Sequence, residues 1–259
     1  MQKLAPITDD MRTLAAKFAA ELNVSDKIHP ADFIFQFLIT NPVFKDKANA
    51  VRYYFYDGMQ SAKLLNSLIT ELGIDPAAKP KVLEFASGYG CVSRQFANHM
   101  PDAETLSCDI HQDAIDFLQN ELGKPAVLSN SIPEMLELRS EFDIVFALSF
   151  FSHMPRLTWL RWLLALYARV KPNGYLIFTT QGLKTARLYM GNPKVPDDGF
   201  WFKPESEQGD LDSSEYGQTV VTETFVRDQL KYLPNAELVK HEEAFWWTHQ
   251  DLYVIRRTQ

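Results

Sequence analysis

Apolar side chains recur at helical spacing through residues 1–78, and no strand-like alternation interrupts them. Between Met11 and Leu22 they return every three or four residues, which predicts an amphipathic helix. A second short helix is predicted from Phe33 and ends at Asn41-Pro42, because proline cannot continue a helix. A third is predicted from Tyr53 to Ile69. We expect residues 1–78 to form a helical N-terminal cap with no nucleotide chemistry of its own.

From about Lys79 the pattern changes to strands that alternate with helices, which is typical of an α/β domain. Residues 182–218 lose periodicity, so we expect an insertion or lid there. The closing residues predict a final strand pair. The predicted strands are 82–85, 105–110, 126–128, 142–148, 175–180, 237–245 and 251–256, and the predicted helices are 111–122, 157–170 and 221–233, with a turn at 171–174.

A glycine-rich turn follows the first predicted strand. Residues 81–94 read K-V-L-E-F-A-S-G-Y-G-C-V-S-R, which predicts a strand, a tight turn and a helix. Glycines let the backbone approach a ligand closely, and a helix N-terminus offers unpaired N–H groups, so the segment suits a nucleotide. A dinucleotide fingerprint would need a third glycine where Ser93 stands. The remaining alternative is a plain strand–helix turn that happens to contain glycines.

The same turn has an acid two residues before its small residues, in the order Glu84-x-Ala86-x-Gly88-x-Gly90. This order resembles the E/D-x-G-x-G-x-G motif of class I S-adenosylmethionine (SAM)-dependent methyltransferases. Ala86 stands where that family has its first glycine, and we expect only a slight tightening of the loop.

The order of the predicted strands resembles the same family over residues 80–257. The resemblance implies a doubly wound, Rossmann-like α/β methyltransferase sheet with a terminal antiparallel strand and, here, the N-terminal helical cap. It implies a SAM-binding domain at residues 79–259, with 182–218 as its insertion or lid.

The resemblance also implies residues that hold the cofactor. Asp109 ends the second strand, where a carboxylate suits two ribose hydroxyls, although it could instead cap the following helix. Ile110 would then pack on the adenine, and Asn130 would either accept from the adenine amino group or belong to a simple turn. The cofactor-binding residues implied in this way are Glu84, Phe85, Ala86, Gly88, Gly90, Asp109, Ile110, Asn130, Ser131 and Ser149.

His153 is the candidate catalytic residue. It follows the fourth strand in a loop that resembles the H-x-P-like turn of small-molecule methyltransferases, and imidazole can take a proton near neutral pH. The alternative is that His153 orients the loop, since methyl transfer can proceed by alignment alone.

Composition narrows the possible functions. A net charge of -7 without basic clusters argues against a nucleic-acid partner. Two cysteines suit a reducing cytoplasm, and we expect a cytoplasmic protein with no signal peptide or membrane partner. No histidine or cysteine spacing suggests a metal.

The sequence therefore predicts a SAM-dependent methyltransferase that acts on a small-molecule acceptor, with O-methylation favoured because His153 is available. Two alternatives stay open: an NAD-dependent oxidoreductase, and a non-catalytic protein with the methyltransferase fold that binds SAM. The sequence predicts no oligomeric state.

Overall fold

The computed structural model describes residues 4–138, 141–205, 208–209 and 211–259. Residues 1–3 of the predicted cap and residues 206, 207 and 210 of the predicted insertion lie outside the described residues. The chain forms two compact units. The first unit contains the residues up to Pro80 and Ala86–Ser129, and the second unit contains Lys81–Phe85 and Asn130–Gln259.

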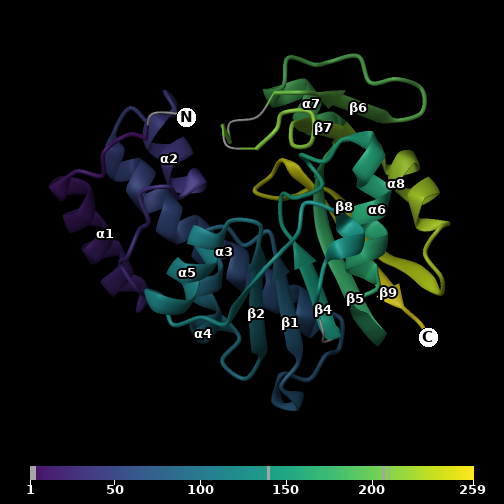
Figure 1. Cartoon of the computed structure of the whole chain (residues 1–259), viewed down its shortest axis with the longest axis horizontal. Helices are drawn as coiled ribbons and strands as arrows, with labels where there is room; N and C mark the ends of the chain where they lie inside the picture. Colours follow the sequence, from purple (N-terminus) through teal and green to yellow (C-terminus); the bar gives the residue numbers. More distant parts are fainter. Residues whose placement is uncertain (1–3, 139–140, 206–207, 210) are drawn as a thin grey trace. The chain divides into compact units, whose positions relative to one another are not determined.

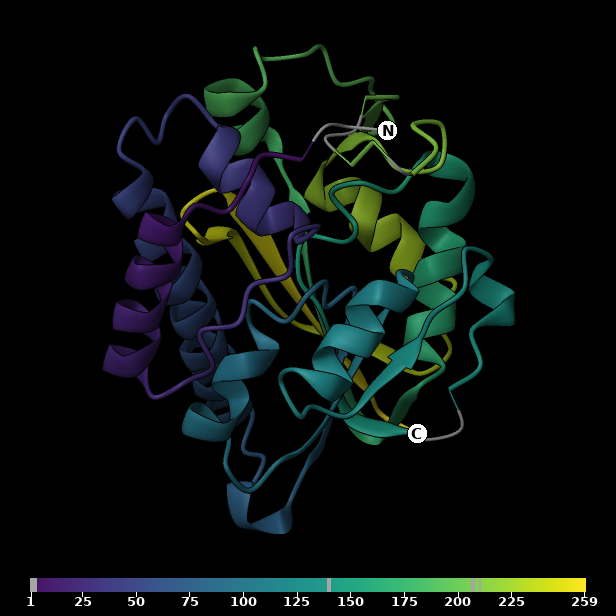
Figure 2. The same ribbon diagram turned by 60° about the vertical axis from the view of Figure 1, so that its left-hand side comes forward.

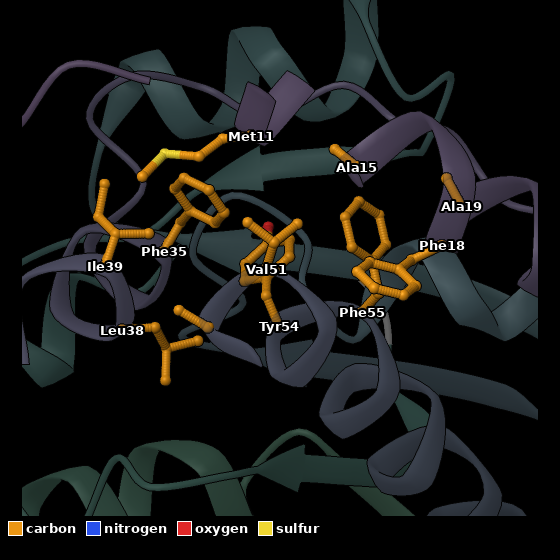
Figure 3. Packing of buried hydrophobic residues seen from close by; sticks show 11 residues of the cluster. Met11, Ala15, Phe18, Ala19, Phe35, Leu38, Ile39, Val51, Tyr54 and Phe55 are labelled. Atoms are coloured by element: carbon orange, nitrogen blue, oxygen red, sulfur yellow. The ribbon is translucent and has the colours of Figure 1, made fainter. Parts of the chain in front are cut away.

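The N-terminal helices of the first unit pack around a shared apolar core. Figure 3 shows side chains from these helices converging on Val51, Tyr54 and Phe55, and the helices are the purple and blue segments of Figure 1. Each begins at a polar cap that accepts a backbone N–H, so the predicted helical character of this segment is confirmed. The helices are α1 (Asp9–Leu22), α2 (Phe33–Thr40) and α3 (Lys47–Glu71).

A parallel strand pair completes the first unit. β2 and β3 run in register from Ser107 opposite Ala126 to Asp109 opposite Leu128, so both strands end at Asp109 and Leu128. Helix α5 packs its buried face, which includes Leu118, beside them. The elements are η1 (Pro76–Ala78), η2 (Ser93–Gln95), α4 (Phe96–His99), β2 (Glu104–Asp109), α5 (Gln112–Asn120) and β3 (Ala126–Leu128).

The second unit contains parallel strands in the order β1-β4-β5 and a terminal antiparallel hairpin. Strand β9 pairs along β5 from Tyr175 opposite Arg256 to Gln181 opposite Gln250, and β8 pairs with β9. Figure 2 shows this hairpin in yellow. The elements are β1 (Lys81–Phe85), η3 (Pro133–Met135), β4 (Phe142–Ala147), α6 (Arg156–Tyr167), β5 (Val170–Gln181), α8 (Glu223–Leu230), β8 (Ala236–Trp246) and β9 (Gln250–Arg257).

The segment expected to be an unpatterned insertion contains regular structure among its described residues. Helix α7 (Leu183–Tyr189) follows β5, and β6 (Phe200–Lys203) pairs antiparallel with β7 (Gln218–Val221). Strand β7 also pairs with β5 at Gln181. The sequence did not predict these elements, because they are too short to show a period. Whether the segment acts as a lid stays a prediction.

The helix predicted directly after the glycine turn is also different in the structure. Residues 91 and 92 form a turn, η2 follows, and α4 has four residues. The backbone hydrogen bonds here do not keep one helical spacing. Arg94 N–H donates to the Gly90 carbonyl, four residues back, whereas Gln95 N–H donates to the Val92 carbonyl, three residues back. A sustained helix dipole therefore does not support the turn, contrary to the expectation from the sequence.

The predicted turn at residues 171–174 is a bulge inside β5. Val170 pairs with Phe142 and Tyr175 pairs with Ile144, so the intervening residues of β5 lie opposite Asp143 alone. The Asp143 carboxylate accepts from Lys171 Nζ at 2.9 Å, which holds the bulge against β4. None of the helices in the described ranges is long and apolar enough to cross a membrane.

Candidate functional site

The glycine loop after β1 adopts left-handed backbone conformations at alternate residues. The φ angles are 58° at Ala86, 55° at Gly88 and 80° at Gly90. A Cβ on Gly88 would meet no atom within 4 Å, so glycine suits this position because of its backbone angle and leaves an open approach to the loop. The loop therefore has the shape of a ligand cradle, with an alanine where the family has its first glycine.

Gly90 is required for a different reason. A Cβ there would lie 2.7 Å from Leu118 Cδ2 and 2.8 Å from Leu122 Cδ1. These atoms belong to α5 and to the residues just after it, so the absent side chain lets the loop pack directly against them. Gly90 therefore supports the loop through packing within the first unit.

Asp109 joins the loop to the end of β2. Its Oδ2 accepts from Gly88 N–H at 2.8 Å, and its Oδ1 accepts from His111 N–H at 3.0 Å. The His111 ring Nδ1 lies 2.9 Å from the same Oδ1. Asp109 is buried, and of its two oxygens Oδ2 receives a single described hydrogen bond. A carboxylate oxygen has two acceptor directions, so Oδ2 is the atom that can receive a ligand hydroxyl.

The structure also tests the alternative in which Asp109 caps the following helix. The residue at the N-cap of α5 is His111, and its side chain makes no capping bond. Asp109 lies two residues earlier and accepts from His111 N–H, so it stabilises the entry to α5 and, through Gly88, the glycine loop. Ile110, the next residue, is 38% exposed at the same edge, which leaves it accessible to a ligand.

Glu84 and Phe85 lie in β1 of the second unit, and both are buried. The Phe85 ring contacts Phe150 edge to face with centroids 4.9 Å apart, and Trp162 at 5.2 Å. The side chain of Phe85 is therefore part of the apolar core. Its predicted contact with a cofactor would have to be made by its backbone.

Asn130 and Ser131 form a turn after β3. The Asn130 side-chain oxygen accepts from Ile132 N–H at 2.9 Å, which is the simple-turn alternative left open by the sequence. Ser131 is exposed. Roles of both residues in binding adenine stay predictions.

Ser149, just beyond β4, belongs to a closed ring of hydrogen bonds. Its N–H donates to Thr179 Oγ1, Thr179 donates to Gln250 Oε1, and Gln250 Nε2 donates back to Ser149 Oγ. Ser149 Oγ lies 3.1 Å from Ser152 Oγ, and Ser152 donates to the Ser149 carbonyl. Thr179, Gln250 and Ser152 are buried. The ring holds Ser149 at a φ of 58°, a conformation that a serine adopts only under constraint.

His153 is fixed by its neighbours in the second unit. Its ring Nδ1 lies 2.8 Å from the Gly217 carbonyl oxygen, and its own carbonyl accepts from Gly217 N–H. Tyr216 stacks on the imidazole with centroids 4.4 Å apart and ring planes within 6°. A carbonyl only accepts, so Nδ1 carries the proton and Nε2 is the basic nitrogen of neutral His153.

The sequence identified only some of the residues in this arrangement. Gly88 and Asp109, which were both predicted to bind the cofactor, are joined by a hydrogen bond, whereas the contacts of Thr179 and Gln250 were missed. Gln250 is 101 residues from Ser149, so no local spacing signals their contact. Arg94, inside the glycine segment itself, was also missed. The signal that the sequence offered is a basic residue four positions after Gly90.

Other described features add no second site. In the described part of the chain, no group of three or more histidines, cysteines and carboxylates is arranged to hold a metal. A half-open cavity of about 360 Å³ in the first unit is lined by α1, the 26–30 segment and α5, and it includes no predicted site residue.

Comparison with known protein families finds a match to part of this chain. A family model described as a methyltransferase domain matches residues 83–176. These residues include the glycine loop, Asp109, Ser149 and His153. No curated protein matched the sequence of the chain.

Solved structures share the fold. A SAM-dependent methyltransferase from Clostridium acetobutylicum matches with a TM-score of 0.59 and 13% identity, covering 86% of this chain and 96% of that one. An amino pentose methyltransferase from Micromonospora echinaspora, solved with SAM, matches with a TM-score of 0.55 and 15% identity, covering 78% and 92%. The 1,6-didemethyltoxoflavin-N1-methyltransferase of Burkholderia thailandensis matches with a TM-score of 0.54 and 14% identity, covering 100% and 93%.

At these identities the likeness establishes the fold. The predicted fold class, a Rossmann-like methyltransferase sheet with mostly parallel strands and a terminal antiparallel strand, is confirmed. The predicted domain division at residues 78 and 79 and the predicted roles of individual site residues stay predictions.

Proposed function

We propose that this protein is a class I SAM-dependent methyltransferase and that it transfers a methyl group from SAM to an oxygen of a small-molecule acceptor. The match of residues 83–176 to a methyltransferase domain, together with the shared fold, supports the family, the enzyme class and the cofactor predicted from the sequence. The acceptor class and the acceptor atom are our proposal.

The hydrogen bond from Gly88 N–H to Asp109 carries the proposal. It joins the glycine motif to the acid at the end of β2 within one compact unit. The residues present suit SAM. A buried carboxylate oxygen of Asp109 has a remaining acceptor direction for a ribose hydroxyl, and the open side of Gly88 leaves room for a ligand. We propose that Asp109 binds the ribose, that Ile110 packs on the adenine, and that the loop backbone binds the rest of the cofactor.

Methyl transfer requires few further groups from the protein. SAM, when bound, supplies an electrophilic methyl group on a sulfonium sulfur. The protein has to align the acceptor with that group and exclude water. The basic Nε2 of His153, with its tautomer set by Gly217, would remove the proton of an acceptor hydroxyl as the oxygen attacks. This geometry supports O-methylation over the N-methylation named for the Burkholderia enzyme.

The small size of the acceptor is supported by composition and by the neighbours. The net charge of -7 disfavours a polyanionic acceptor such as RNA or DNA. One structural neighbour acts on an amino pentose and another was solved with 1,6-didemethyltoxoflavin, both small molecules. We propose a sugar, a natural-product intermediate or an aromatic hydroxyl compound as the acceptor.

Calorimetric titration with S-adenosylhomocysteine (SAH), with NAD as the control, tests the cofactor. We expect SAH to bind at micromolar concentration and NAD not to bind. The Asp109→Ala variant should bind SAH at least about tenfold more weakly, because a charge-assisted hydrogen bond is lost. Unchanged SAH affinity in a folded Asp109→Ala protein would remove this residue from the site, and binding of NAD alone would favour the oxidoreductase alternative.

The His153→Gln variant tests the base. We expect SAH affinity to be unchanged and turnover with an accepted substrate, measured as SAH formation, to fall about 100-fold or more, which is the typical contribution of a general base. Native turnover in this variant would mean that His153 only supports its loop. SAH binding without turnover on any acceptor would favour the non-catalytic alternative.

A further inference from the structure

Arg94 is a buried arginine whose guanidinium holds the glycine loop from within the first unit. It is 3% exposed. Its Nε donates to the Gly90 carbonyl at 3.0 Å, and one terminal nitrogen donates to the carbonyls of Ser25 and Lys27 at 3.0 and 2.9 Å. Its other terminal nitrogen donates to the Tyr54 hydroxyl at 3.0 Å. One side chain therefore ties the loop to α3 and to the segment between α1 and α2.

Tyr54 passes this connection on to α2. Its hydroxyl donates to Asp32 Oδ2 at 2.5 Å, and Asp32 Oδ1 accepts from Phe35 N–H, which caps α2. Burial raises the pKa of Tyr54 well above its ordinary value, so the hydroxyl keeps the proton that it donates. Figure 3 shows Tyr54 in the middle of the apolar cluster. The neutral Tyr54 hydroxyl thus lies between the Arg94 and Asp32 side chains and forms a hydrogen bond with each. These bonds offset part of the cost of burying the two charges.

The backbone of α3 is seated on the residues that follow the glycine loop. Cys91 Sγ lies 3.3 Å from the Tyr54 carbonyl, and Gln95 Nε2 donates to the Phe55 carbonyl at 3.3 Å. A Cβ on Gly58 would lie 2.1 Å from the Cys91 carbonyl oxygen, so the helix and the loop are in direct backbone contact there. The absent side chain of Gly58 therefore permits this close approach.

We propose that Arg94 and Tyr54 are positioning residues for the cofactor loop, and that the N-terminal helices are in this way part of the cofactor site. The inference rests on the proposed function. The Gly90 carbonyl accepts from Arg94, and two residues earlier Gly88 N–H donates to Asp109. The two bonds hold glycines, whose backbone angles are freer than those of other residues, on either side of Tyr89. Fixing the Gly90 carbonyl fixes the direction of the peptides that meet the cofactor.

Two neighbouring tyrosines provide a matched test. Tyr54→Phe removes the hydroxyl between Arg94 and Asp32, whereas Tyr56→Phe, on the same helix, removes an exposed hydroxyl that donates to Glu21 at 2.7 Å. We expect Tyr54→Phe to bind SAH about tenfold more weakly by calorimetry, since it loses hydrogen bonds to charged groups. Tyr56→Phe should bind as the native protein does. Both variants are to be assayed well below their unfolding temperatures.

Arg94→Lys gives a second, independent variant. A lysine has the charge but not the fork that reaches Gly90, Ser25 and Tyr54 together, so it should weaken SAH binding as well. Hydrogen exchange of residues 86–95 without any ligand should be faster in Tyr54→Phe and Arg94→Lys than in the native protein and in Tyr56→Phe.

SAH affinity and hydrogen exchange of the loop together distinguish failure of the proposed function from failure of the positioning role. If the native protein does not bind SAH, the proposed function fails, and loop exchange alone then decides whether Arg94 positions the loop. If folded Tyr54→Phe and Arg94→Lys lose thermal stability but keep native SAH affinity and native loop exchange, both residues are merely structural and the inference is overturned.

Discussion

Ala86 has a left-handed backbone conformation, with a φ of 58°, at the position where the family motif has a glycine. An L-residue with a Cβ has about 1–2 kcal/mol more energy there than glycine does. The Ala86 side chain is exposed, so its methyl group gains little from packing in return. The departure from the motif is therefore a local strain, where the sequence suggested only a slight tightening.

The Ala86→Gly variant should relieve this strain. We expect the free energy of unfolding to rise by about 0.5–1 kcal/mol, because the greater freedom of glycine in the unfolded chain offsets part of the gain. Urea denaturation of both proteins measures the difference. A loss of stability would mean that the Ala86 methyl group makes a contact worth more than the strain.

Asp251 is a second residue under local stress. Burial raises its pKa from 3.8 to about 6, and the nearby Glu243 adds to the increase. Ala244 N–H donates to its carboxylate at 2.8 Å, and Lys184 also lowers the pKa, but burial prevails. A Cβ on Gly182 would collide with its other oxygen, so Asp251 is packed directly against that backbone.

The raised pKa has a definite sign for stability. Between pH 3.8 and about 6 the folded protein binds the Asp251 proton more tightly than the unfolded chain does, so stability falls as pH rises through this window. The full cost, about 3 kcal/mol, is present above pH 6.

The Asp251→Asn variant removes this titration while its amide oxygen still accepts a backbone N–H. We expect the free energy of unfolding of the variant, relative to the native protein, to rise by up to about 3 kcal/mol between pH 4 and pH 7. Urea denaturation across that range gives the difference at each pH. If the difference does not change with pH, Asp251 titrates near its ordinary value in the folded protein.

At the scale of elements, long periodic segments were predictable and short irregular ones were not. Helices α1, α3 and α5 and the strands around Asp109 lie where the apolar pattern predicts them, because packing on one face imposes a period. The short α4 has no such period, and α7 and β6 have too few residues to show one. The bulge in β5 looked like a turn because Pro172, Asn173 and Gly174 are turn residues wherever they occur.

The contacts of the candidate site also divide into those with a local sequence signal and those without one. Gly88 and Asp109 could be selected as candidates because strand ends and glycine spacing are local signals, and in the structure a hydrogen bond joins them. The contacts of Arg94 with Tyr54 and of Gln250 with Ser149 join residues 40 and 101 positions apart. Only the tertiary fold brings such pairs together, so one sequence gives no spacing from which to infer them.

Gly58 gives a prediction at the scale of the helix. The Cβ of a Gly58→Ala variant would lie 2.1 Å from a backbone oxygen of Cys91, and a backbone atom cannot move away as a flexible side chain can. The higher helix propensity of alanine, about 1 kcal/mol, acts in the opposite direction. We expect a net loss of about 1–3 kcal/mol in the free energy of unfolding, with weaker SAH binding.

Gly73→Ala is a useful comparison for this variant, because a Cβ there meets no atom within 4 Å. Its left-handed φ of 74° still makes alanine unfavourable, so it should lose stability through strain alone and keep native SAH affinity. Thermal unfolding and SAH titration of both variants separate the effects. A Gly58→Ala protein as stable as the native one would show that α3 is not seated on the loop.

At the scale of the whole molecule, the compact units do not follow the division that the sequence suggests. The chain passes from one unit to the other at Pro80–Lys81, at Phe85–Ala86 and at Ser129–Asn130. The N-terminal helices therefore share their unit with the glycine loop and Asp109, and a cut at residue 78 would divide that unit. The helices are then in the same unit as the residues for which we propose cofactor binding.

Expression of residues 79–259 alone tests this at the largest scale. The fragment keeps Gly88, Arg94 and Asp109 but lacks the Tyr54 hydroxyl and the Ser25 and Lys27 carbonyls, so the buried guanidinium would lose most of its partners. We expect no SAH binding by calorimetry and reduced helical content by circular dichroism. Co-expression of residues 1–78 as a separate chain should restore binding, because the missing partners return without the peptide link. A fragment 79–259 that binds SAH with the affinity of the full chain would show instead that residues 1–78 are a separable cap, as the sequence alone suggested.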